Sequence, residues 1–197
     1  SEEVMNNTMI DIQTVGTRPT SAIIALSAIK FDFGSDNMDA FTVNIDPTNW
    51  MRLGLTYEKS TIDYWKSVDS SFKDILFTNR VDLESGMDSF LKFLGDDPKS
   101  LNYWSYGTLL GFPIISHNLG IIGKQEPWIV SNVMDSRTVF KVFGVNRTAA
   151  QAAPNATAVL AKKLLGAEMD AIALDVGIRT FTGLNIIAKP DLRRLTH

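Results

Sequence analysis

The chain has 197 residues, of which 45% are hydrophobic and 21% are charged. These fractions are typical of globular domains, and they exclude a disordered, collagen-like or coiled-coil chain. The net charge of −3 excludes a basic domain that binds nucleic acid through charge alone. The absence of cysteine excludes disulfides and a thiolate nucleophile. We expect a single domain over residues 1–197, with its core over about 8–187.

The location of the protein is inferred from the length of its apolar runs. These runs are far shorter than the ~20 residues that a membrane-spanning helix needs, and residues 1–8 are acidic and polar. We therefore expect no membrane segment and no signal peptide, and a cytoplasmic protein.

Three strand patterns open the chain. Residues 8–12, 21–33 and 40–45 are rich in alternating and β-branched side chains, and turns containing Gly, Pro, Asn or Asp separate them. Consecutive strands joined by short turns predict an antiparallel meander.

Helical and strand patterns alternate after the meander. Ser60 is predicted to cap a helix over 61–68, and the apolar residues of 83–94 lie on one helical face. Further predicted elements are a strand at 101–106 and helices at 109–122, 136–143, 155–165 and 170–187. This order predicts an α/β fold with a mixed sheet flanked by helices.

Two acidic residues stand in apolar surroundings. Asp11 and Gln13 are two residues apart in the first predicted strand, so both side chains leave the same face. Asp175 lies among apolar residues of the last predicted helix, where a carboxylate is rare unless it is paired or binds a metal. In a structural role, Asp11 would cap a turn and Asp175 would pair with Arg179. In a functional role, the two aspartates would bind one divalent cation, because such cations prefer oxygen ligands.

Several segments of the chain carry a family resemblance. Residues 9–19, 23–31, 60–65, 107–115, 135–138 and 170–181 resemble successive motifs of the DEDD (DnaQ-like) 3'-5' exonucleases, in the branch of phage exonuclease A and the mycobacterial exoribonucleases. The resemblance implies a ribonuclease-H-like mixed sheet, with an antiparallel meander followed by parallel strands. It also implies two Mg²⁺ or Mn²⁺ ions roughly 4 Å apart, held by four carboxylates.

The residues at the family's catalytic positions depart from its pattern. The resemblance makes Asp11 the first metal ligand and Asp175 the last. Gln13 stands where the family has Glu, Gly111 where it has its second Asp, and Asp170 where it has the histidine that acts as general base. We expect at most two of the four carboxylates, and hence one weak Mg²⁺ or Mn²⁺ site or none.

The last motif of the family can also be aligned in a second way. In this alignment Asn155 stands where the family has its last Asp, and an alanine stands in the histidine position. We prefer Asp175, because the resemblance implies at least one whole helix between the Arg-Thr pair at 137–138 and the last motif.

Three functions compete on this sequence. The first is an inactive or strongly attenuated 3'-5' exonuclease fold that binds single-stranded DNA or RNA, or a protein partner. The second is an active exonuclease that uses Asp11, Asp170 and Asp175 around one metal. The third is a scaffold or inhibitor with no nucleic-acid role, because a fold does not fix a function. A homodimer is compatible with each, and a phage-encoded chain would act in the host cytoplasm.

The basic and aromatic residues do little to distinguish these three functions. Four scattered cations fit a phosphate-contacting rim, although such charges are more often solvated surface: Arg18, Arg137, Lys141 and Arg147. Four aromatic residues are expected to pack in the core rather than to stack on bases: Tyr64, Trp65, Trp104 and Tyr106.

Overall fold

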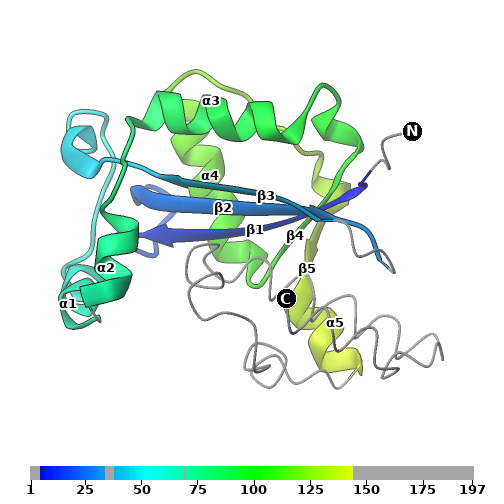
Figure 1. The fold of residues 1–197 in the computed structure, drawn as a ribbon, viewed down its shortest axis with the longest axis horizontal. Helices are drawn as coiled ribbons and strands as arrows, with labels where there is room; N and C mark the ends of the chain where they lie inside the picture. The colour runs from blue at the N-terminus through cyan, green and yellow to red at the C-terminus, as the bar shows by residue number, and fades with distance from the viewer. Residues whose placement is uncertain (1–4, 34–37, 69, 144–197) are drawn as a thin grey trace.

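A mixed sheet forms the centre of the computed structural model, which describes residues 5–33, 38–68 and 70–143 (Figure 1). Its strands are β1 (Asn7–Thr14), β2 (Ile23–Phe31), β3 (Met38–Asn44), β4 (Asn102–Ser105) and β5 (Val133–Asp135). Their order is β3-β2-β1-β4-β5, which makes β1 the central strand. The pairs β1–β2 and β2–β3 are antiparallel, whereas β1–β4 and β4–β5 are parallel. The predicted meander and the later parallel strands are confirmed.

Five helices belong to the described residues: α1 (Lys59–Ser67), α2 (Ser70–Leu76), α3 (Leu83–Leu94), α4 (Thr108–Ile121) and α5 (Ser136–Phe143). Short 3-10 turns are η1 (Pro47–Asn49), η2 (Pro98–Ser100) and η3 (Val130–Asn132). The predictions for α3 and α5 have the observed bounds, and the prediction for α4 is shifted by one residue. The predicted helices at 155–165 and 170–187 lie outside the described residues. Across the described ranges, no helix has the length and apolar character needed to cross a membrane.

The sequence prediction missed α2 and β5. With 7 and 3 residues, both are too short to show a clear hydrophobic period. They arise where neighbouring elements support them, since β5 continues the parallel pairing that β4 begins.

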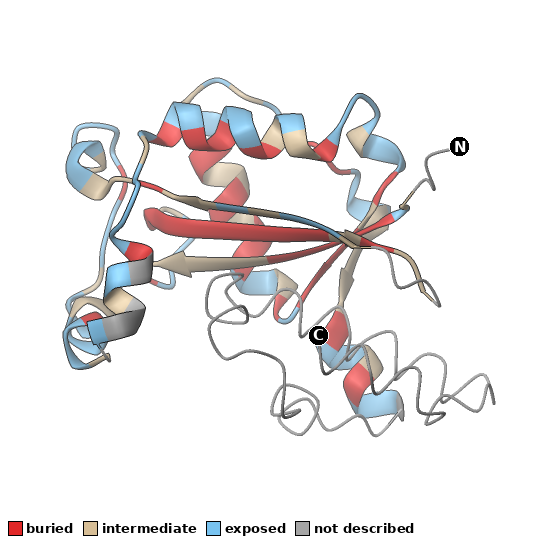
Figure 2. Cartoon of the chain, in the orientation of Figure 1, coloured by how far each residue is buried: buried red, intermediate tan, exposed pale blue. Residues whose placement is uncertain are grey.

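Two apolar cores lie on opposite faces of the sheet. Figure 2 shows buried residues in the strands and on the sides of α3 and α4 that face them. Ile10 belongs to the core covered by these two helices, whereas Met9 packs with Trp104 and with Phe140 of α5. Because side chains alternate along a strand, Asp11 and Gln13 share the face of Met9.

The start of α1 differs from the prediction. The N-cap is Glu58, so Ser60 lies inside the first turn. The Glu58 carboxylate accepts hydrogen bonds from the backbone amide of Thr17 and, at 2.8 Å, from the Thr17 hydroxyl. These bonds explain the difference, because they hold the cap residue against the turn after β1.

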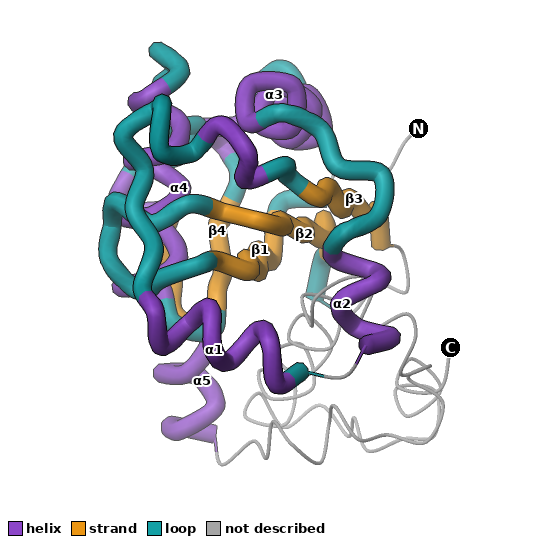
Figure 3. The backbone as a smooth tube through the Cα atoms, turned by 90° about the vertical axis from the view of Figure 1, so that its left-hand side faces the viewer, coloured by secondary structure: helices purple, strands orange, loops and turns teal. Residues whose placement is uncertain are grey.

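A second contact holds α1 against β1. The indole Nε1 of Trp65 donates a 2.8 Å hydrogen bond to the carbonyl of Thr14, the last residue of β1. Figure 3 looks onto this end of the molecule and shows α1 and α2 in front of the strands. Helix α1 therefore fixes the end of the strand that carries Asp11 and Gln13.

The close packing of Gly16 generates a stability prediction. A Cβ on Gly16 would lie 2.5 Å from the Ser21 hydroxyl, which is buried and accepts a 3.1 Å hydrogen bond from the Arg18 amide. We expect Gly16→Ala to lower the free energy of unfolding by about 1–3 kcal/mol in urea denaturation.

Gly120→Ala is the matched control. This residue is exposed within α4 and has no atom within 4 Å of its Cβ position, so alanine should stabilise the helix by about 0.5–1 kcal/mol. A Gly16→Ala protein as stable as the wild type would contradict the close packing of this turn.

Candidate functional site

A small cavity lies between β1 and the first turns of α4. Its volume is about 60 Å³, and both Asp11 and Gly111 line it. The structure thus brings together two of the positions that the sequence singled out. Gln13 lies two residues further along the same face and does not line the cavity. Asp170 and Asp175 lie outside the described residues.

The chain reaches Gly111 through a turn that requires a different glycine. Strand β4 ends at Ser105, and Gly107 has a φ of +109° before α4 begins, a conformation that side chains rarely adopt. Gly111 lies inside α4, and a Cβ there would be 3.6 Å from the Ser105 hydroxyl, an ordinary contact. The fold therefore needs glycine at 107 but has room for a side chain at 111.

Asp135 joins the N-termini of two helices beside this cavity. Its carboxylate accepts hydrogen bonds from the backbone amides of Gly107 (3.2 Å), Thr108 (3.1 Å) and Arg137 (2.9 Å). The Thr108 hydroxyl donates at 3.3 Å, and the Arg137 guanidinium donates at 3.0 Å. Together these bonds set the start of α4, and hence the position of Gly111, relative to α5.

The ionisation of Asp135 follows from this arrangement. Burial is the largest single influence and raises the pKa, but hydrogen bonds from the Arg137 side chain and from three backbone amides outweigh it. The net effect holds the pKa of the Asp135 carboxyl below its usual value. Because a carboxylate has about four lone-pair sites, these donors leave it little capacity to bind a metal as well.

The aromatic residues beside the cavity are less buried than expected. Trp104 is buried, as predicted, but Tyr106 is 41% exposed and lines the cavity mouth. The core prediction for Tyr106 is wrong because β4 ends at Ser105, so the alternation of the strand no longer applies. On α1, Trp65 is buried as predicted, whereas the prediction for Tyr64 is wrong because it faces outward and is 58% exposed.

Three of the four basic residues expected at a phosphate rim are described, and Arg137 lies nearest this region among them. Its guanidinium carbon lies 5.7 Å from the centre of the Tyr106 ring, and about 3.5 Å from the Cβ position of Gly107. Arg18 is instead 3.7 Å from Glu58 at the turn after β1. Lys141 is exposed on α5, and Arg147 lies outside the described residues. Of the three members of that set that the structure describes, Arg137 alone therefore lies beside the cavity.

The ligand set of a two-metal centre is not present in the described part of the chain. No group of three or more His, Cys, Asp or Glu residues gathers there. Among the described residues, Asp11 is the only carboxylate that lines the cavity, Gln13 is a neutral amide, and Gly111 offers no side chain. The described residues therefore do not fit two divalent ions, whose shared site needs several carboxylates.

Sequence reasoning missed several residues of this site. The sequence predictions do not include Asp135 as a helix cap, although an Asp directly before a predicted helix is a typical capping signal. Leu109 and Leu110, 87% and 46% exposed, precede Gly111 at the start of α4. The sequence does not indicate that they are exposed, because the hydrophobic pattern of a uniformly apolar helix does not distinguish exposed positions from buried ones.

The capping role of Asp135 generates a pH prediction. Its pKa is depressed in the folded state, so the stability that it provides is present above its unfolded value of about 3.9 and is lost as the pH falls through its folded value. We expect Asp135→Asn to lower the free energy of unfolding by about 1–3 kcal/mol at pH 7. Urea denaturation should show this difference shrinking below about pH 4. An equal difference at pH 3 and pH 7 would contradict the role of the charge.

The family model of the 3'-5' exoribonuclease Rv2179c-like domain matches residues 6–173. The match therefore includes every described strand and helix, and it ends shortly before Asp175. No curated protein matches the chain.

Among solved structures, the RNase domain of the yeast Pop2 protein is similar, with a TM-score of 0.56 and 11% sequence identity. The similarity covers 91% of this chain and 78% of that one. At this identity it shows the fold alone, and it confirms the predicted ribonuclease-H-like α/β architecture. Because the family model covers most of the sequence, the chain belongs to the family of 3'-5' exoribonuclease Rv2179c-like domains.

Proposed function

We propose that this domain is an inactive or strongly attenuated 3'-5' exonuclease that binds single-stranded nucleic acid at the cavity of Asp11 and Gly111. The observation that carries the proposal is position 111, which lies beside Asp11 and has room for a side chain but has none. The family normally uses divalent metals, and the part of this chain that the structure describes offers few ligands for them.

The missing charges weaken catalysis. Removing one preorganised group that stabilises a transition state typically costs about 3–4 kcal/mol, and the resemblance indicates that three such groups are replaced here, at Gln13, Gly111 and Asp170. The first two changes each remove a negative charge, and the third removes the general base.

The changes at positions 13 and 111 favour binding without a metal. Carboxylates close together repel a phosphodiester unless cations neutralise them, so replacing two of them with Gln13 and Gly111 reduces this repulsion. The Gln13 amide also supplies N–H donors, and exposed Tyr106 at the cavity mouth offers a ring on which a base can stack.

Two other functions remain as alternatives. An exonuclease that uses Asp11, Asp170 and Asp175 around one Mg²⁺ or Mn²⁺ ion would cleave weakly but measurably. A scaffold or inhibitor would neither cleave nor bind nucleic acid, and would act through a protein partner. The two experiments below separate these alternatives from the proposal.

The first experiment measures binding and cleavage together. We expect labelled single-stranded RNA and DNA to remain intact with Mg²⁺ or Mn²⁺. We also expect them to bind in EDTA with an affinity that falls as salt rises. Gln13→Glu is the matched variant, and its added charge should weaken binding in EDTA several-fold. Metal-dependent shortening from the 3' end would support the one-metal exonuclease, and a lack of both binding and cleavage would support the scaffold.

The second experiment restores the family's residues. We expect Gln13→Glu, Gly111→Asp and Asp170→His together to produce metal-dependent 3'-5' cleavage at least about 100-fold above the wild type. Each single change should do little, because catalytic groups that act as a unit are strongly non-additive.

The control triple variant carries Gly111→Ala in place of Gly111→Asp. It places the same Cβ beside Ser105 but adds no carboxylate, so it should stay inactive. A folded Gly111→Asp triple variant that binds two metals and still cleaves neither RNA nor DNA would show that the substrate groove itself differs from that of an active exonuclease.

A further inference from the structure

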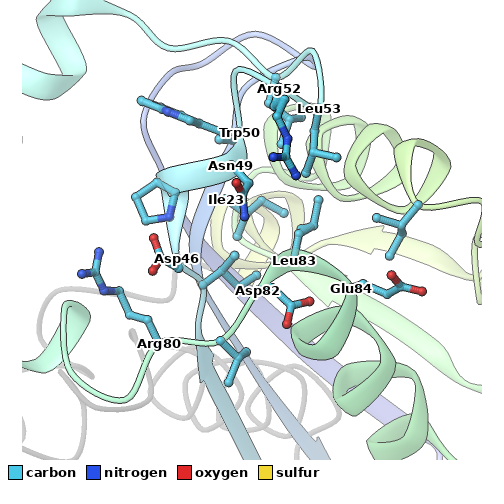
Figure 4. Close-up of a pocket in the computed structure, with 16 residues that line it drawn as sticks. Ile23, Asp46, Asn49, Trp50, Arg52, Leu53, Arg80, Asp82, Leu83 and Glu84 are labelled. Atoms are coloured by element: carbon cyan, nitrogen blue, oxygen red, sulfur yellow. The ribbon is translucent and has the colours of Figure 1, made fainter.

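A second, larger cavity lies away from the Asp11 cavity and shares no lining residue with it. Its volume is about 280 Å³ (Figure 4). The walls are the loop after β3, the segment that leads into α3, the start of β2 and the end of α4. The proposed nucleic-acid function makes no use of this cavity.

Backbone hydrogen bonds hold the walls of this cavity in place. The amide of Leu53 donates to the carbonyl of Trp50 at 3.1 Å, and the amide of Leu55 donates to the same carbonyl at 2.9 Å. The amide of Asp46 donates to the carbonyl of Val81 at 2.7 Å, which joins the loop after β3 to the segment before α3. Because these walls are already fixed, they lose little conformational entropy when a ligand binds.

The floor of the cavity is aliphatic. Ile23, Ile45, Leu55 and Leu83 line it, and each of these residues is at most 6% exposed. All four belong to the main apolar core of the protein. The floor therefore offers an apolar group of a ligand a contact surface away from water.

One cation reaches over this floor. Figure 4 shows Arg52 extending from the loop after β3 toward Ile23 and Leu83. Across the described ranges, Arg52 has no ion pair with a carboxylate. A guanidinium presents its N–H donors in a planar fork that matches a carboxylate, so Arg52 can bind an anionic group of a ligand.

Two carboxylates lie across the cavity from Arg52 (Figure 4). Hydrogen bonds from the hydroxyl and amide of Thr48, both to Oδ1, hold the pKa of Asp46 below its usual value. Bonds from the amide and hydroxyl of Ser85, at 2.9 and 2.7 Å, lower the pKa of Asp82 in the same way. Both carboxylates are therefore ionised at neutral pH and can bind a cationic group of a ligand.

The other two charged residues of the lining are engaged elsewhere. The Arg80 guanidinium lies 5.3 Å from the centre of the Phe77 ring, and Phe77 does not line the cavity. The pKa of Lys124 is raised first by its hydrogen bond to Asp88 and more weakly by the charge of Glu84, so Glu84 acts on that lysine. One guanidinium and two carboxylates are thus the charges that a ligand meets.

These charges narrow the class of ligand. A simple amine would leave the Arg52 guanidinium without an anion, and a nucleotide would bring its phosphate close to Asp46 and Asp82. A zwitterion with an apolar side chain satisfies the guanidinium, the carboxylates and the floor together. The volume of about 280 Å³ falls just below the roughly 300–1,000 Å³ of pockets for drug-sized ligands, so it suits a molecule as small as an amino acid.

We propose that this cavity binds a free α-amino acid with an aliphatic side chain. Its carboxylate pairs with Arg52, its ammonium group pairs with Asp46 or Asp82, and its side chain packs on the floor. The site goes beyond the nucleic-acid function and is independent of it, because the two cavities share no residue. Either one can therefore fail without the other.

Isothermal titration calorimetry of the full chain with leucine tests the proposal. Three related compounds each lack one recognised feature: leucinamide has no carboxylate, 4-methylpentanoate has no ammonium group, and glycine has no side chain. We expect leucine to bind and each of the other three to bind at least about tenfold more weakly.

Variants of Arg52 locate the binding site. Arg52→Ala should weaken leucine binding at least about tenfold and leave the weaker binding of leucinamide unchanged, because leucinamide has no carboxylate for the guanidinium to bind. Arg52→Lys should recover part of the affinity, since it keeps the charge but not the planar fork. Lys99→Ala is the matched control, because this exposed lysine lies in η2 and does not line the cavity. It should leave the affinity for leucine unchanged.

Three results would overturn the proposal: no binding of leucine, binding of leucinamide as tight as that of leucine, or an Arg52→Ala protein that binds leucine like the wild type. Tighter binding of adenosine 5'-monophosphate than of leucine would overturn it as well, since the ligand would then be an anion. Circular dichroism should show that the variants fold. If Arg52→Ala does not fold, the comparison of the four compounds on the wild type still decides.

Discussion

The carboxylate of Asp135 is the contact on which the arrangement of the candidate site depends. It gathers the first amides of α4 and α5 on one anion, at the ends of the parallel strands β4 and β5, of which β4 pairs with β1. The partial positive charge of each helix start favours this anion, so the charge stabilises both helices together. Gly111 lies next to Asp11 because α4 starts where Asp135 holds it.

The residues that shape the cavity differ from the residues at the positions where metal ligands are expected. The residues that shape the cavity are present: the turn at Gly107, the hydroxyl of Ser105 and the cap at Asp135. Where the family resemblance implies metal-binding carboxylates, this chain has the amide of Gln13 and the bare backbone of Gly111. A protein can keep the first set and lose the second, because packing and capping stabilise the folded chain whether or not a substrate reacts.

Hydrophobic periodicity in the sequence was enough to predict the meander, α3 and α5, since each has a clear local pattern. It could not predict the bonds of Asp135 to Gly107, because these residues are 28 positions apart and meet only through the sheet topology. The contact between Ile45 and Val81 was equally hidden, since these residues become neighbours only through an isolated bridge. Exposure of Tyr106 depended on where β4 ends, and strand ends are poorly marked in sequence.

The parallel pairing of β1 with β4 also constrains how the chain folds. The hydrogen bond from Trp104 to Asn7 joins residues 97 positions apart, so closing this contact requires ordering a long loop. During synthesis, β1 therefore has one edge open until β4 has left the ribosome, while its other edge already pairs with β2. An open strand edge is a template for aggregation, which makes the strand of Asp11 the vulnerable element of every incomplete chain.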